Sequence, residues 1–104
     1  DHPLVRAHPD TGQPLLYVCP MYLDRLLGLT SDESDLVLGH LNRIVNDPNI
    51  AVRWRWSTGD VAIWDESATV HQALADHAGH LRRMRRYTID GGRPRRALEG
   101  VEAA

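Results

Sequence analysis

One histidine and two arginines are spaced so that they could bind a metal ion and small anions. His71 follows an apolar, strand-like run, ten residues separate it from Arg82, and Arg86 lies four positions further on. Imidazole is a common metal ligand, and a guanidinium binds a carboxylate or a similar oxyanion through a forked pair of hydrogen bonds. The pattern is therefore compatible with a metal ion held beside anionic molecules.

The face on which each arginine lies depends on the strand that residues 81–89 are predicted to form. Alternate side chains of a strand share a face, so Arg82 and Arg86 would stand roughly 13 Å apart on one face and could bind different anions. Arg83 and Arg85 would lie on the opposite face. Two other interpretations stay open, namely a solvated edge strand that discourages aggregation and a basic surface that neutralises nucleic-acid phosphates.

The composition indicates one globular domain and excludes several classes of protein. The chain has 104 residues and a net charge of −2, which argues against a generally basic nucleic-acid binder. No apolar run approaches the ~20 residues of a membrane span. Cys19 is alone, so no intrachain disulfide is possible, and we expect a cytoplasmic location. The opening letters, D-H-P-L-V-R, are not a signal peptide and read as the interior of a longer chain.

The first half of the chain predicts a hairpin and a helix. Short apolar runs at 4–8 and 15–18 flank H-P-D-T-G-Q-P, which is dense in turn-forming residues. Thr30 and Glu33 then form a capping box, and apolar residues follow at helical spacing until Asn46-Asp47-Pro48 ends the pattern. Such an amphipathic helix must cover a sheet to bury its apolar face.

The second half favours strands. Residues 52–56 alternate between apolar and charged types, 61–64 are apolar, and 81–89 form the last long run, with turns at 57–60 and 76–80. The predicted fold class is α+β and mainly β, with one external helix. We expect the domain to cover 1–94 and the tail at 95–104 to be poorly ordered.

Several stretches, in order, resemble the C-terminal part of the taurine dioxygenase (TauD/TfdA) family. They are H-P-L-V-R-A-H-P-D-T-G at 2–12, G-L-T-S-D-E-S at 28–34, V-R-W-R-W-S-T-G-D-V-A-I-W-D at 52–65 and R-R-M-R-R-Y-T-I-D-G at 82–91. The spacing H-x10-R from His71 to Arg82 also fits. The resemblance implies a double-stranded β-helix (a jelly roll), here its C-terminal portion, and dependence on Fe(II) and 2-oxoglutarate.

The resemblance also implies roles for individual residues. The family holds iron by two histidines and one carboxylate, and His71 falls at the position of the distal histidine. Arg82 falls where the far carboxylate of 2-oxoglutarate binds, and Arg86 where the anionic group of the substrate is gripped. Trp64 and Tyr22 fall near the iron and substrate pockets, although both could be ordinary packing aromatics.

The chain departs from the family at the other two iron ligands, which form an H-x-D or H-x-E pair further upstream. His8-Pro9-Asp10 matches that pattern by letter, but it lies in the predicted hairpin turn and is not expected to bind metal. We therefore expect this chain to be inactive by itself and to belong to a longer polypeptide or associate with another copy.

The predicted function is hydroxylation of a small anionic substrate with O2 as the oxidant. An alkyl sulfonate such as taurine, a sulfate ester and a carboxylate all remain open as substrates. The alternatives are a non-catalytic relative with the β-helix fold and a basic nucleic-acid-binding module.

Overall fold

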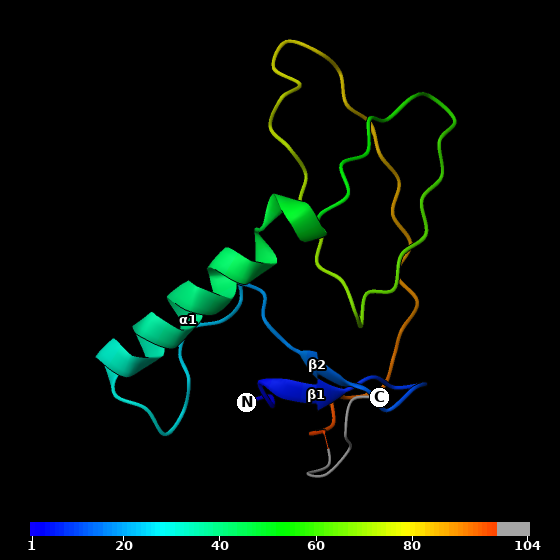
Figure 1. Cartoon of the computed structure of the whole chain (residues 1–104). Helices are drawn as coiled ribbons and strands as arrows, with labels where there is room; N and C mark the ends of the chain where they lie inside the picture. Colours follow the sequence, from blue (N-terminus) through cyan, green and yellow to red (C-terminus); the bar gives the residue numbers. More distant parts are fainter. Residues whose placement is uncertain (98–104) are drawn as a thin grey trace.

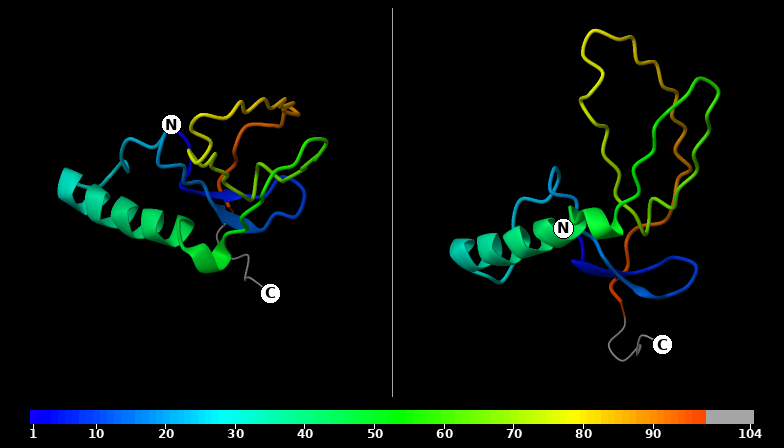
Figure 2. Two further views of the ribbon diagram at one scale, coloured as in Figure 1. Left: turned by 90° about the horizontal axis from the view of Figure 1, so that it is seen from above. Right: turned by 45° about the horizontal axis from the view of Figure 1, so that its top comes forward.

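The computed structural model describes residues 1–97 of the chain. Its regular elements are, in order, β1 (Val5–Ala7), β2 (Pro14–Leu16), α1 (Ser31–Val45) and the short 3-10 helix η1 (Pro48–Ile50) (Figure 1). The residues that follow η1 form long open loops, which project away from the helix and the hairpin (Figure 2). Within residues 1–97, no helix has the length and apolar character needed to cross a membrane.

The predicted hairpin is confirmed. β1 and β2 pair antiparallel, with Val5 opposite Leu16 and Ala7 opposite Pro14. The connecting turn closes when the Gly12 N–H donates to the His8 carbonyl oxygen at 2.9 Å. Gly12 has φ +74°, in the left-handed region where a side chain would be strained, so the glycine of H-P-D-T-G is required by the turn.

β1 is also paired along its second edge. The Ala7 N–H donates to the Arg95 carbonyl oxygen at 2.9 Å, and Arg6 forms an antiparallel bridge with Arg96. Arg95 and Arg96, at the start of the predicted tail, therefore lie against β1. The rest of that tail, residues 98–104, is outside the described residues.

The predicted helix is confirmed together with its cap. Thr30 is the N-cap of α1, its hydroxyl accepts from the Glu33 N–H at 3.3 Å, and the Thr30 N–H donates to the Glu33 carboxylate at 2.8 Å. The hydrogen bond from the Thr30 backbone, followed by that from its hydroxyl, lowers the pKa of Glu33. Ser34 is buried, and its Oγ accepts from the Leu26 N–H at 2.9 Å, which ties the helix to the preceding loop.

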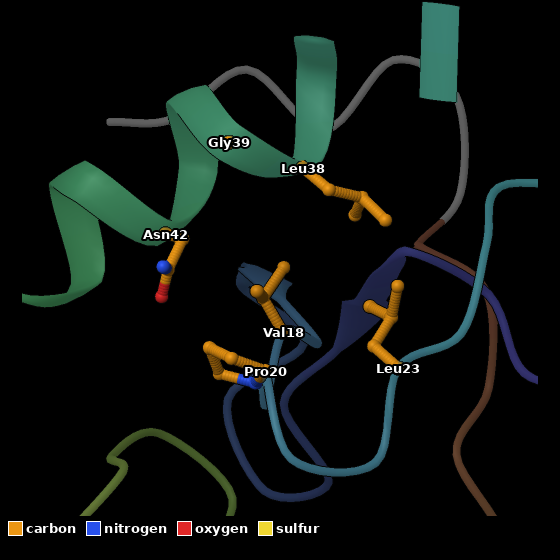
Figure 3. Close-up of a pocket in the computed structure, with 6 residues that line it drawn as sticks. All are labelled: Val18, Pro20, Leu23, Leu38, Gly39 and Asn42. Atoms are coloured by element: carbon orange, nitrogen blue, oxygen red, sulfur yellow. The ribbon is translucent and has the colours of Figure 1, made fainter. Parts of the chain in front are cut away.

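α1 packs on the segment that follows β2 and not on a broad sheet. Leu38 and Asn42 project from the helix toward Val18 and Pro20, and these residues border an apolar hollow of about 190 Å³ (Figure 3). Val18 is the one hydrophobic side chain that is buried among the described residues. The expectation that the helix covers a sheet is thus not met, and Leu36 on its apolar face stays 75% exposed.

The prediction of strands in the second half is wrong for the described residues. The segments 52–56, 61–64 and 81–89 are irregular, and no backbone hydrogen bond joins any two of them within the described part of the chain. A strand needs a partner because its N–H and C=O groups bond to a neighbour and not within the segment. The observed unit is α+β, with one two-stranded sheet and one α-helix. The jelly roll remains a prediction.

The unpaired segments leave the chain open and its apolar side chains in solvent. The Cα radius of gyration is 16.5 Å, whereas a compact domain of about 100 residues has about 13 Å. Val52, Ile63 and Ile89, which the sequence places on predicted strands, are between 92% and 95% exposed.

The helix interior offers a test of the local structure. Gly39 lies within α1, and an added Cβ there would meet no atom within 4 Å. Gly39→Ala should raise the free energy of unfolding by about 0.5–1 kcal/mol, because alanine loses less backbone entropy in a helix than glycine does. Thermal unfolding should show a higher Tm.

The matched control is Gly59→Ala. This methyl also enters open space, but Gly59 has φ +93° and belongs to a turn. The substitution should destabilise by about 1 kcal/mol, because the left-handed conformation crowds a Cβ. Shifts of the same sign in both variants would contradict the backbone assignment.

Candidate functional site

The candidate iron ligand follows directly on a tight turn at residues 65–69. The Asp65 Oδ1 accepts from the Ser67 N–H at 2.8 Å, and the Asp65 carbonyl oxygen accepts from the Ala68 and Thr69 N–H groups at 3.2 and 3.1 Å. The Thr69 hydroxyl donates to the same carbonyl at 2.7 Å. Asp65 therefore organises the turn, and His71 begins the segment that leaves it.

His8, at the end of β1, holds this turn through its imidazole ring. Its Nε2 lies 2.7 Å from the Asp65 Oδ2. Its Nδ1 accepts from the N–H groups of Asp10 and Thr11, both at 3.2 Å. Because Nδ1 is an acceptor, the ring proton is on Nε2, which donates to the carboxylate. Both nitrogens of His8 are thus engaged, in agreement with the expectation that His8 and Asp10 are not a ligand pair.

Arg6 supplies a second contact from the same strand to the same turn. Its Nη2 donates to the Ser67 carbonyl oxygen. The guanidinium carbon lies 4.2 Å from the centroid of the Tyr17 ring, so the cation is stacked on an aromatic face. Arg6 and His8 are two residues apart and therefore point to the same side of β1, toward the turn.

His71 contacts the residues on either side of Asp65. The Trp64 and His71 ring centroids are 4.8 Å apart, with an angle of 47° between the ring planes. The Trp64 indole N–H donates to one oxygen of the Glu66 carboxylate at 2.6 Å, and the other oxygen lies 3.8 Å from the His71 Nδ1. At 3.8 Å the carboxylate makes no hydrogen bond to Nδ1, and neither ring nitrogen of His71 has a hydrogen-bond partner among residues 1–97.

The other predicted site residues are not gathered around His71. Arg82 and Arg86 are exposed, and within the described part of the chain no hydrogen bond or ion pair links either to the histidine. Tyr22 is 83% exposed and lies in the loop after β2, where its N–H donates to the Cys19 carbonyl oxygen. The structure thus brings together His71 and Trp64, and within residues 1–97 no hydrogen bond, ion pair or ring contact joins the three remaining candidates to them. The hollow beneath α1 contains none of these residues.

The residues present fit one position of an iron site. His71 has the right donor type and a ring nitrogen available for a metal. The described residues contain no group of three or more His, Cys, Asp and Glu side chains that could hold a metal ion.

Sequence reasoning missed four residues of this arrangement: Arg6, Asp65, Glu66 and, as a positioning group, His8. The contact between His8 and Asp65 spans 57 residues. No periodicity or local motif relates positions that far apart. The one usable signal was the run of turn formers around His8, which predicted a reversal of the chain there but not the partner of His8 across the fold.

Comparison with known proteins identifies the family to which the chain belongs. The family described as "Taurine catabolism dioxygenase TauD, TfdA family" matches residues 1–88. This match covers most of the chain, so the chain belongs to the TauD/TfdA family, as its motifs predicted.

Individual relatives specify the class further. An "Alkylsulfatase" of Acinetobacter baylyi is 38% identical over 91 residues, covering 88% of this chain and 28% of the relative. An "Alpha-ketoglutarate-dependent sulfate ester dioxygenase" of Pseudomonas putida is 39% identical over 98 residues, covering 90% and 31%. An "Alpha-ketoglutarate-dependent dioxygenase" of Neocamarosporium betae is 41% identical over 81 residues, covering 76% and 24%.

The chain spans between about a quarter and a third of the length of these relatives. No solved structure matches it significantly. Two of these relatives are named as dependent on α-ketoglutarate, which is another name for 2-oxoglutarate. Their names agree with the cosubstrate that the motifs implied.

The His8–Asp65 contact predicts an acid-sensitive carboxyl group. The hydrogen bond from His8, and after it that from the Ser67 N–H, lowers the pKa of Asp65. A carboxyl with a lowered folded-state pKa stabilises the fold above its ordinary pKa, and this contribution is lost as the pH falls through the folded value. The titration midpoint of Asp65, followed by the NMR shift of its carboxyl carbon, should lie below the ordinary range.

His8→Ala should move that midpoint upward, toward the value of a free aspartate. An Asp65 midpoint that does not change in His8→Ala would show that the two side chains are not paired in solution.

Proposed function

We propose that this chain is the C-terminal part of an Fe(II)- and 2-oxoglutarate-dependent dioxygenase that hydroxylates a small organic anion, with a sulfate ester as the first candidate. The observation that carries the proposal is His71, which lies against Trp64 and Glu66 directly after a turn anchored to β1. The names of two relatives, an alkylsulfatase and a sulfate ester dioxygenase, support this substrate class. A sulfonate such as taurine and a carboxylate remain as further candidates.

Each candidate residue has a distinct part in this proposal. His71 would hold the iron through its imidazole. Arg82 would anchor the far carboxylate of 2-oxoglutarate, and Arg86 would grip the anionic group of the substrate, each by a forked pair of hydrogen bonds. Trp64 would form one wall of the iron pocket, and Tyr22 would lie at the edge of the substrate pocket.

When bound, Fe(II) supplies the activation of O2 and the oxidation, while 2-oxoglutarate becomes succinate and CO2. The protein orients the substrate so that the C–H bond next to its sulfate oxygen is the one hydroxylated. The resulting carbon carries both a hydroxyl and a sulfate group, and it collapses to an aldehyde and free sulfate. We place this reaction in the cytoplasm.

The exposed apolar segments support a longer polypeptide as the working unit. Val52 and Ile63 lie on segments with strand-like sequence but no partner strand within residues 1–97. The chain also spans no more than about a third of its relatives. The rest of such a polypeptide would supply the partner strands and the other iron ligands.

The chain alone should therefore be inactive. Fe(II)-dependent formation of succinate from 2-oxoglutarate should be undetectable for the isolated 104-residue chain and readily measured for the full-length protein. Turnover by the isolated chain would contradict the proposal that the ligands lie elsewhere. A full-length protein that binds neither Fe(II) nor 2-oxoglutarate would favour the non-catalytic alternative.

Kinetic measurements on the full-length protein should distinguish the roles of Arg82 and Arg86. Arg82→Ala should raise the KM for 2-oxoglutarate about 10-fold or more, because it removes hydrogen bonds to a charged group worth about 1.5–3 kcal/mol. Arg86→Ala should raise the KM for the sulfate ester by a similar factor and have little effect on that for 2-oxoglutarate.

Arg83→Ala is the matched control, since Arg83 is the sequence neighbour of Arg82 with the same charge but is not a candidate site residue. It should leave both KM values within about twofold. An unchanged KM for 2-oxoglutarate in Arg82→Ala would remove Arg82 from the site. Salt-dependent binding of DNA or RNA that weakens in Arg83→Ala would favour the nucleic-acid alternative.

A further inference from the structure

We propose that His8 is a positioning residue for the iron site, because its ring holds in place the turn that carries His71. This inference rests on the proposed function of His71 as an iron ligand. His8 itself binds no metal in the proposal, and it acts through Asp65.

The donor direction of His8 is set by the hairpin turn. Its Nδ1 receives the N–H groups of Asp10 and Thr11, so the ring is held in the tautomer with the proton on Nε2. That N–H is directed at the Asp65 carboxylate, 2.7 Å away. The His8 side chain is only 10% exposed, so water competes poorly for this donor.

Two contacts fix the turn where one would allow it to rotate. His8 holds the Asp65 side chain, and the guanidinium of Arg6 holds the Ser67 carbonyl oxygen. Arg6 is itself stacked on Tyr17 of the hairpin. A turn attached at two points two residues apart keeps both its position and its orientation relative to β1.

Fixing Asp65 fixes the two residues that touch His71. Trp64 and Glu66 are the sequence neighbours of Asp65 on either side, and their side chains are joined by a hydrogen bond of 2.6 Å. The Trp64 ring lies against the His71 ring, and the Glu66 carboxylate lies 3.8 Å from its Nδ1. At 3.8 Å the Glu66 carboxylate makes no hydrogen bond to His71, so the closer restraint on the His71 ring is its packing against Trp64. His8 thus reaches His71 through Asp65 and its two neighbours.

The test measures the Kd for Fe(II) of the full-length protein under anaerobic conditions by calorimetry, alongside its thermal unfolding. His8→Ala should weaken Fe(II) binding about 10–100-fold, the range found when groups that orient metal ligands are removed. His8→Gln, which can still offer an N–H to Asp65, should recover part of the affinity. His80→Ala is the matched control and should bind Fe(II) normally, since the His80 side chain makes no hydrogen bond to a described residue.

Asp65→Asn provides a second route to the same answer. It keeps an oxygen for the Ser67 N–H but removes the carboxylate that faces His8, so it should also weaken Fe(II) binding about 10-fold or more. If His8→Ala does not fold, Asp65→Asn decides alone.

His71→Ala separates the two proposals. If it leaves the Fe(II) affinity unchanged, the proposed function fails. If it abolishes Fe(II) binding while folded His8→Ala and Asp65→Asn variants bind as the parent does, His71 is a ligand but the positioning role of His8 is overturned. A lower Tm with unchanged Fe(II) affinity likewise overturns it, because His8 would then only stabilise the fold.

Discussion

The hydrogen bond between His8 and Asp65 is the interaction on which the arrangement of the described chain most depends. Val18 is the one buried hydrophobic side chain among residues 1–97, so packing contributes little to long-range order. Polar contacts from β1 take that place. His8 and Arg6 bind one turn that is some 60 residues away in sequence. Apart from them, the pairing of residues 95–97 with β1 also ties the end of the loops that carry His71 to the hairpin.

The features that could be predicted from sequence are those whose partners are close in sequence. The hairpin turn needs only H-P-D-T-G, and the start of α1 needs only Thr30 and Glu33, so both are present as expected. The turn at 57–60 is closed by the Asp60 N–H and the Ser57 carbonyl oxygen, again within four residues. The prediction of strands at 52–56, 61–64 and 81–89 was wrong because the partner of a strand need not be close to it in sequence. Their alternation is a preference for one buried face, and it forms a strand only where a neighbour supplies the ladder.

The same distinction applies to the candidate site. The motif that contains Trp64 and His71 is local, and the two rings do lie together. The common face assigned to Arg82 and Arg86 depends on a strand that is not formed among the described residues, so their relation to His71 stays a proposal. Asp65 and Glu66 gave no signal of their own, because their importance comes from His8 across the fold and from the ring of His71.

Comparing His8 with His71 shows why letters alone do not define a metal ligand. Each imidazole lies near a carboxylate, and His8 even belongs to an H-x-D triplet with Asp10. A ligand, however, must offer a lone pair to the metal, and in His8 the one basic nitrogen already accepts two backbone N–H groups while the other carries the proton. In His71 the carboxylate faces Nδ1, and Nε2 has no partner among the described residues. His8, which resembles a ligand by sequence, thus uses both ring nitrogens in hydrogen bonds that hold the structure. In the proposal, these hydrogen bonds position His71, whose Nε2 stays free to bind the metal.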